Sequence, residues 1–135
     1  MALIAVAVAG KIEVVESDRQ MTLPAEEAIV AGAPVRIDTT SGKFTNSNGT
    51  TAGEARVWGI ALASVAANEY VTAVRRGVLD GFTFTQAYDA AIYVSDTDGR
   101  LGDAAGTVST PVGRVISAWA QRLGTAADKV LSLEL

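Results

Sequence analysis

The stretch that decides the fold is "EYVTAVRRGVLDGFTF", residues 69–84. From Tyr70 and Val71 onward its side chains alternate between two faces, as in an extended strand, and its β-branched residues suit a pleated surface. Gly77 and Gly81 interrupt the run. At such glycines we expect bulges or corners where a strand of a barrel bends. The stretch therefore predicts a long strand in a curved sheet.

The rest of the chain has the same character. It contains 135 residues, of which 49% are hydrophobic, and this size fits one domain with its own core. Short apolar runs rich in Val, Thr and Ile are separated by turn residues, a pattern typical of sandwiches and barrels. We expect a single β-rich domain over residues 1–135, mainly β, as a compact β-barrel or β-sandwich with at most one or two short helical segments. One such segment is Ala25–Ala31, because Pro24 suits a first helical turn and Glu26 favours its dipole.

Two stretches predict hairpins. In "VRIDTTSGKFTNS", residues 35–47, alternation leads into a turn at Ser41–Gly42. In "VSDTDGRLGD", residues 94–103, Asp98 and Gly99 suit a type I′ turn, in which both central residues take positive φ.

The second of these stretches also raises the question of a metal site. An EF-hand-type calcium loop would need an oxygen ligand where Val94 stands and a bidentate Glu where Ala105 stands. Both ligands are missing, so we predict a hairpin turn and no metal site. A metal-dependent carboxylate site would require several aspartates to converge, drawn from Asp80, Asp89, Asp96, Asp98 and Asp103.

The composition excludes several kinds of chemistry. The chain has no Cys and no His, so thiolate nucleophiles, Cys-ligated zinc and Ser-His-Asp hydrolysis are ruled out. No phosphate-loop or dinucleotide-binding motif is found. The formal charge of −4 and the lack of polybasic runs predict neither a nucleic-acid partner nor a membrane partner. We therefore expect no enzyme, no catalytic residue and no cofactor.

The apolar segment "ALIAVAVAG", residues 2–10, has two interpretations. It is shorter than the roughly 20 residues of a membrane span, and no positive charge precedes it, as a signal peptide would require. Synthesis in the cytoplasm is the expectation. The segment is then either an internal strand, or an arm that adds to a strand edge of a partner. In the second case the contacts would come from Ala2, Leu3, Ile4, Val6 and Val8.

Arginine and aromatic residues supply the other candidate contacts. Arg75, Arg76 and Arg114 flank glycines, where they either meet carboxylates of a partner or are solvated strand ends. Trp58 and Trp119 are either core residues or interface anchors. Together with Tyr88, the two tryptophans could also form the stacking platform of a small carbohydrate-binding module.

Four stretches in a fixed order resemble tailed-phage capsid decoration proteins, also called cement or head-stabilising proteins. They are "LPAEEAIVAGAPVRIDTTSGKFTNSN" (23–48), "ARVWGIALASV" (55–65), "VTAVRRGVLDGF" (71–82) and "AAIYVSDTDGRLGDAAGTVSTPVGRVI" (90–116). The shared features are a Gly-Ala-Pro-Val strand opening, a Gly-Ile-Ala strand, an Arg-Gly-Val-x-Asp-Gly strand end, and a late hairpin ahead of Val-Gly-Arg-Val. The resemblance covers about Leu23 to Leu135, and the order of the elements carries it.

The resemblance implies a non-enzymatic, compact β domain on the outer surface of the virion. Such proteins bind the major capsid protein of an expanded head, often as homotrimers between capsomers, and they reinforce the shell against packaged DNA. A phage head-fibre or tail-associated structural domain is the alternative that the same composition leaves open.

Overall fold

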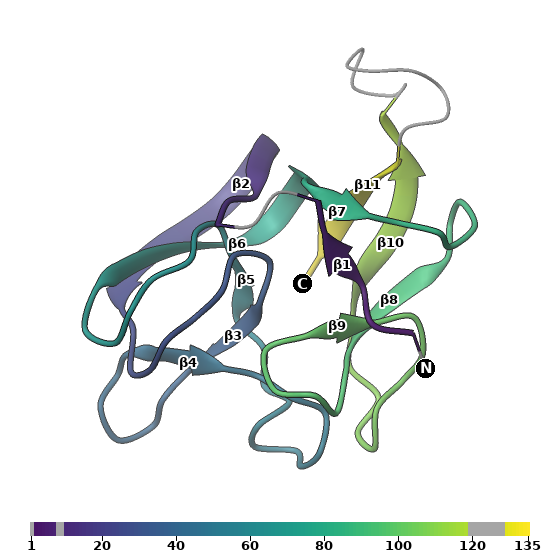
Figure 1. Ribbon diagram of the computed structural model, residues 1–135. Coiled ribbons are helices and arrows are strands. Elements are labelled where there is room, and N and C mark those ends of the chain that lie inside the picture. Colours follow the sequence, from purple (N-terminus) through teal and green to yellow (C-terminus); the bar gives the residue numbers. More distant parts are fainter. Residues whose placement is uncertain (1, 8–9, 119–128) are drawn as a thin grey trace.

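The computed structural model describes residues 2–7, 10–118 and 129–135, and it shows a chain built from strands (Figure 1). No α-helix occurs in these residues, and the main sheet curls into half a barrel, which confirms the mainly β fold. The strands are β1 (Ala5–Val6), β2 (Glu13–Pro24), β3 (Pro34–Ile37), β4 (Phe44–Asn46), β5 (Gly59–Ala61), β6 (Tyr70–Asp80), β7 (Phe82–Thr83), β8 (Ala91–Val94), β9 (Leu101–Gly102), β10 (Pro111–Ser117) and β11 (Lys129–Glu134).

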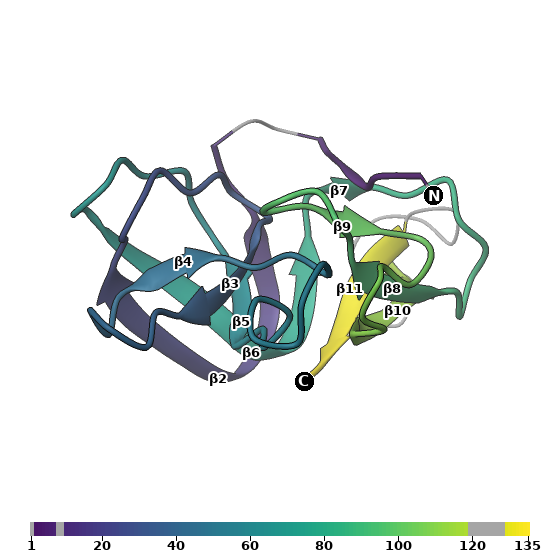
Figure 2. The same ribbon diagram turned by 90° about the horizontal axis from the view of Figure 1, so that it is seen from below.

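The strand β6 joins two halves of the molecule. Among the described residues the larger sheet runs β4-β3-β5-β6-β11-β10-β8-β9, and β2 pairs with β6 from Tyr70 to Asp80. On its other edge β6 pairs with β5 at Ala73 and Val74 and with β11 at residues 76–79. The strands β3 to β5 thus lie on one side and β8 to β11 on the other (Figure 2). No described strand pairs with the outer edge of β2.

Gly77 allows β6 to bend where the two halves meet. Its φ is +148°, and a Cβ at this position would lie 2.1 Å from the carbonyl oxygen of Glu16. The register between β2 and β6 shifts next to this point, between Val14 and Glu16 and again between Ser17 and Arg19. The predicted bulge at Gly77 is therefore confirmed, because only glycine tolerates both this φ and this close approach.

Besides a small cluster of Val78, Ala118 and Val130, two large hydrophobic clusters pack against β6. The larger one includes Val74 and Leu79 together with residues of β8, β10 and β11. The second lies under the β3–β5 side and includes Phe44, Val71 and Ala73. Because neighbouring residues Ala73 and Val74 belong to different clusters, both faces of β6 are covered at this point.

The expected helix at Ala25–Ala31 does not form. The backbone N–H of Ala25 donates to the carbonyl of Glu69, and Ile29 exchanges backbone hydrogen bonds with Val65. These long-range bonds hold the segment in a non-helical conformation that bends at Glu26 and Glu27. They outweigh a local preference that rested on one proline and the helix dipole.

Both predicted hairpins are present. Strands β3 and β4 pair with Ile37 opposite Phe44, and Gly42 in their turn has a φ of +74°. Strands β8 and β9 pair around a longer loop than expected, closed by a hydrogen bond of 3.0 Å from the N–H of Ser95 to the carbonyl of Arg100. The type I′ assignment was wrong, because Gly99 has a φ of +66° but its neighbour Asp98 does not take positive φ.

The N-terminal segment belongs to the fold. Ile4 is buried in the larger cluster, and its N–H donates to the carbonyl of Leu101 at 3.0 Å. β1 then pairs with β7, with Ala5 opposite Thr83. These contacts support the internal-strand interpretation for residues 3–6. In the described part of the chain, no helix has the length and apolar character needed to cross a membrane.

Candidate functional site

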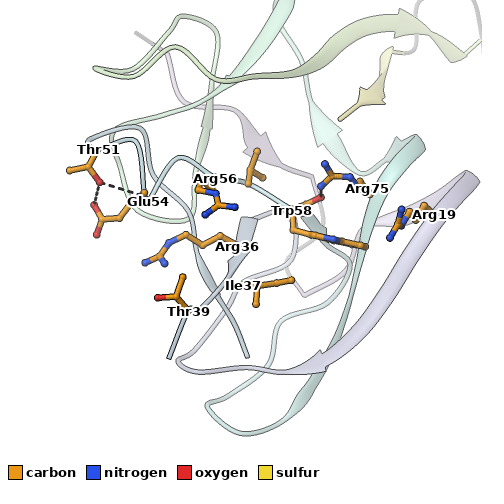
Figure 3. Close-up of a pocket in the computed structure, with 11 residues that line it drawn as sticks. Arg19, Arg36, Ile37, Thr39, Thr51, Glu54, Arg56, Trp58 and Arg75 are labelled. Carbon is orange, nitrogen blue, oxygen red and sulfur yellow. Dashed lines mark hydrogen bonds between the residues drawn. The ribbon is translucent and has the colours of Figure 1, made fainter. Parts of the chain in front are cut away.

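A pocket lies on the β3–β5 side, and four arginines contribute to its wall (Figure 3). Its volume is about 910 Å³, which is near the upper end for ligand pockets. We call it the arginine pocket. It is lined by Arg19, Arg36, Ile37, Thr39, Thr51, Gly53, Glu54, Arg56, Val57, Trp58 and Arg75.

The four arginines come from four different elements. Arg36 lies on β3 and Arg75 on β6, while Arg56 lies in the loop before β5. Arg19 lies on β2 between two shifts of register, and bulges of this kind re-aim a side chain. In the view of Figure 3, Arg36 and Arg56 lie on one side of the Trp58 ring and Arg19 on the other, while Arg75 lies over the ring.

Three of these guanidinium groups make no hydrogen bond or ion pair with the described residues, although the pKa of Asp38, lowered mainly by backbone hydrogen bonds, is also lowered by the charge of Arg36. Arg19, Arg36 and Arg56 make no ion pair or side-chain hydrogen bond there, and the Nε of Arg36 is buried without a hydrogen-bond partner. A buried, unsatisfied donor is costly in a folded protein. The acid of the wall, Glu54, accepts hydrogen bonds from the hydroxyls of Thr50 and Thr51 instead.

Arg75 and Trp58 form the fixed part of the wall. The Nη1 of Arg75 donates to the carbonyl oxygen of Trp58 at 2.8 Å, and its Cζ lies 5.7 Å from the centre of the indole ring. The Trp58 ring also packs on Phe44 at 5.7 Å between centroids. Trp58 is half-buried, so it is both a core residue and part of an accessible wall.

The other aromatic candidates do not extend this surface. Tyr88 is 48% exposed, and the Nζ of Lys129 lies 5.0 Å from its ring centre. Trp119 lies outside the described residues. Arg75 lies over the Trp58 ring and Lys129 over the Tyr88 ring, so each of these rings already has a cation against it.

The structure separates the predicted arginine contacts. Arg75 lies in the pocket, but Arg76 donates from its Nε to the carbonyl oxygen of Leu135 at 2.8 Å. Arg114 forms ion pairs of 2.8 Å with Asp89 and 3.2 Å with Glu134. Only Arg75 of the three therefore contributes to the pocket wall.

The residues predicted as N-terminal contacts also differ in their exposure to solvent. Leu3 is 39% exposed and Ala2 is exposed, whereas Ile4 is buried and Val6 half-buried against the core. Val8 lies outside the described residues. A partner could reach Ile4 only if the segment left its place against the core.

The aspartates of the late hairpin have separate roles. Asp96 accepts hydrogen bonds from the backbone N–H and the hydroxyl of Thr107, at 2.8 and 2.9 Å. Asp98 accepts one of 3.0 Å from the side-chain amide of Asn48. Three acidic side chains do not gather into a possible metal site anywhere in residues 2–7, 10–118 or 129–135. Residues 94–103 thus form a turn whose aspartates accept hydrogen bonds from the neighbouring loops that contain Asn48 and Thr107.

Asp103 ties the N-terminal segment to the hairpin. Its carboxylate accepts a hydrogen bond of 2.9 Å from the backbone N–H of Ala2 and one of 3.4 Å from Gln86. These bonds stabilise the charged form, so they lower the pKa of Asp103, with the Ala2 bond as the larger cause. The pKa of Arg114 is raised by its hydrogen bond to Asp89 and by that charge.

Arg19, Arg36 and Arg56 line the pocket but were not predicted as site residues. Arg36 and Arg56 each lie beside a valine in a strand-like run, where a charged residue is ordinarily a solvated position. Their convergence depends on strand pairing that no local signal specifies. A comparison of the chain with known protein families, with curated proteins and with solved structures finds no match.

Proposed function

We propose that this chain is a non-enzymatic structural protein that binds the outer surface of a tailed-phage capsid and stabilises the expanded head. The major capsid protein is its partner, and copies group as homotrimers between capsomers. The arginine pocket carries the proposal, together with the resemblance described above. It offers unpaired guanidinium groups beside an accessible tryptophan, and both residue types are enriched where proteins bind each other.

The mechanism is multivalent adhesion. A single contact of ordinary size covers about 800 Å² per partner, and a trimer multiplies its avidity without any new type of contact. The compact fold suits this role, because a rigid surface loses little conformational entropy when it binds.

The test is the copy number in purified virions of the source phage. Quantitative mass spectrometry would compare this protein with the major capsid protein. We expect a ratio near one to one. A few copies per particle would indicate a head-fibre or tail-associated component instead, and absence from virions would contradict the structural role altogether.

A further inference from the structure

We infer that the arginine pocket binds an acidic segment of the partner protein in which two carboxylates flank an apolar side chain. The inference rests on the proposed function, in which that segment belongs to the shell protein. It deepens the function by assigning the site and the chemistry of the residues that enter it.

The charge of the pocket requires compensation. Four arginines and Glu54 give its wall a net charge of +3, so the remainder of a chain whose total is −4 carries −7. Guanidinium groups gathered around one hollow repel each other, and no described carboxylate is paired with them. A bound carboxylate would relieve this repulsion and form forked hydrogen bonds with the guanidinium plane.

The buried Nε of Arg36 gives a second reason to expect a negative charge near this guanidinium. It has no hydrogen-bond partner, although such donors are nearly always satisfied in folded proteins. A carboxylate that approaches this guanidinium from the pocket would place a negative charge against it, which compensates the buried donor electrostatically.

The arrangement around Trp58 indicates the order of the ligand groups. In the view of Figure 3, Arg36 and Arg56 lie on one side of the indole ring and Arg19 on the other, and Ile37 and Val57 add apolar surface to the wall. In an extended chain, residues i, i+2 and i+4 face the same way. In such a ligand, an acidic residue at i would meet arginine on one side of Trp58, and an acidic residue at i+4 would meet arginine on the other side. The apolar residue at i+2 would then lie against Trp58 itself.

The distribution of charge favours a protein segment over nucleic acid. Four of the chain's eleven Lys and Arg residues line this hollow, while the remainder of the chain has a net charge of −7. Nucleic acid carries a charge at every nucleotide, so a strand extending past the pocket would meet repulsion. A short acidic segment flanked by neutral residues would not, because its charges stay within about one Debye length of the arginines.

The experiment is isothermal titration calorimetry with the full chain at low salt. The probe is the capped heptapeptide Ser-Glu-Ser-Leu-Ser-Glu-Ser, and its neutral match has Gln in place of both Glu residues. Oligothymidylate and inorganic phosphate are titrated alongside. The variants are Arg56→Gln and the double variant Arg36→Gln/Arg56→Gln. Arg114→Gln, outside the pocket, is the control, and circular dichroism checks that each variant folds.

We expect the acidic peptide alone to bind. Its affinity should fall about tenfold in Arg56→Gln and about a hundredfold in the double variant, and Arg114→Gln should match the original chain. Equal binding of the neutral peptide, or no loss in the folded double variant, would overturn the inference. Tighter binding of oligothymidylate would assign the pocket to nucleic acid, and phosphate binding as tight as the peptide would assign it to small oxyanions. Either result would also overturn it.

A second assay separates this inference from the proposed function. Purified expanded heads are incubated with the original chain and with the double variant. Equal binding of both to heads would contradict the pocket assignment and support capsid decoration. Peptide binding without head binding would support the pocket and contradict decoration.

Discussion

Arg36 and Arg75 show how one residue type takes two roles in one pocket. The guanidinium of Arg75 is held by the Trp58 carbonyl and lies over the indole ring. That of Arg36 has a buried Nε and no hydrogen-bond or ion-pair partner among the described residues. Arg75 therefore supports the structure, whereas Arg36 makes no comparable contact within the described residues.

Replacing each of these arginines with methionine tests that difference. Arg36→Met removes an unsatisfied buried donor but keeps an unbranched stem, so we expect the free energy of unfolding to stay the same or rise. Arg75→Met loses a hydrogen bond and a cation–π contact, so we expect a loss of about 1–2 kcal/mol. Urea denaturation measures both. A larger loss for Arg36→Met than for Arg75→Met would contradict the assignment.

Asp103 gives the stability of the N-terminal segment a dependence on pH. Its pKa is lowered in the folded state, chiefly by the N–H of Ala2. A lowered folded pKa means that the charged group stabilises the fold above its unfolded pKa, near 3.9, and that this contribution disappears as the pH falls below that value.

We therefore expect Asp103→Asn to be less stable than the original chain near neutral pH. The difference should shrink as the pH falls below about 4, where the original carboxyl takes up a proton. Thermal unfolding of both proteins between neutral and acid pH measures it. A difference that stays constant through the acid range would show that Asp103 does not contribute through its charge.

At the scale of the elements, the shape of β6 depends on one backbone position. Gly77→Ala would place a methyl group 2.1 Å from the Glu16 carbonyl at a φ of +148°. We expect a loss of about 3 kcal/mol, because the backbone of β2 must move. Gly53→Ala is the matched control, since nothing lies within 4 Å of its added Cβ, and it should change stability by less than about 0.5 kcal/mol. Chemical denaturation would give both values, and equal losses would mean that β6 does not need this bend.

The N-terminal segment can be tested with two neighbouring residues. Ile4 is 3% exposed within the larger cluster, whereas Leu3 is 39% exposed. Ile4→Ala should therefore cost about 3 kcal/mol in unfolding free energy and Leu3→Ala about 1 kcal/mol. If the segment were a free arm, both variants would keep full stability in guanidinium titrations and would differ only in binding to a partner.

Short sequence patterns correctly predicted the elements that depend on residues close together in the chain. The β3–β4 hairpin followed from alternation around Ser41–Gly42, and the bend of β6 followed from Gly77. The segment Ala25–Ala31 was predicted incorrectly, because its backbone bonds to the connection between β5 and β6, about forty residues away in sequence, and such bonds leave no local signature. For the same reason, only Arg75 of the four pocket arginines was predicted as a contact residue. Arg19, Arg36 and Arg56 come close to it only in the folded sheet.

At the scale of the whole molecule, β6 couples the two halves. Both large hydrophobic clusters include residues of this strand, so neither half keeps its core if β6 leaves. We expect one cooperative unfolding transition, in which Thr45 of β4 and Val115 of β10 exchange their amide hydrogens with similar free energies of opening. Native-state hydrogen exchange measures this. Opening of β10 at a much lower free energy than β4 would show that the halves unfold separately.

The outer edge of β2, with which no described strand pairs, bears on whether the protein aggregates at high concentration. Exposed, unpaired strand edges recruit other strands and start aggregation. Along β2 the register shifts three times, and Glu16, Asp18 and Arg19 place charges in its middle. A neighbouring copy would find neither a flat ladder nor an apolar strip to extend. Many copies can therefore be stored at high concentration, or packed side by side, without their sheets fusing into fibrils.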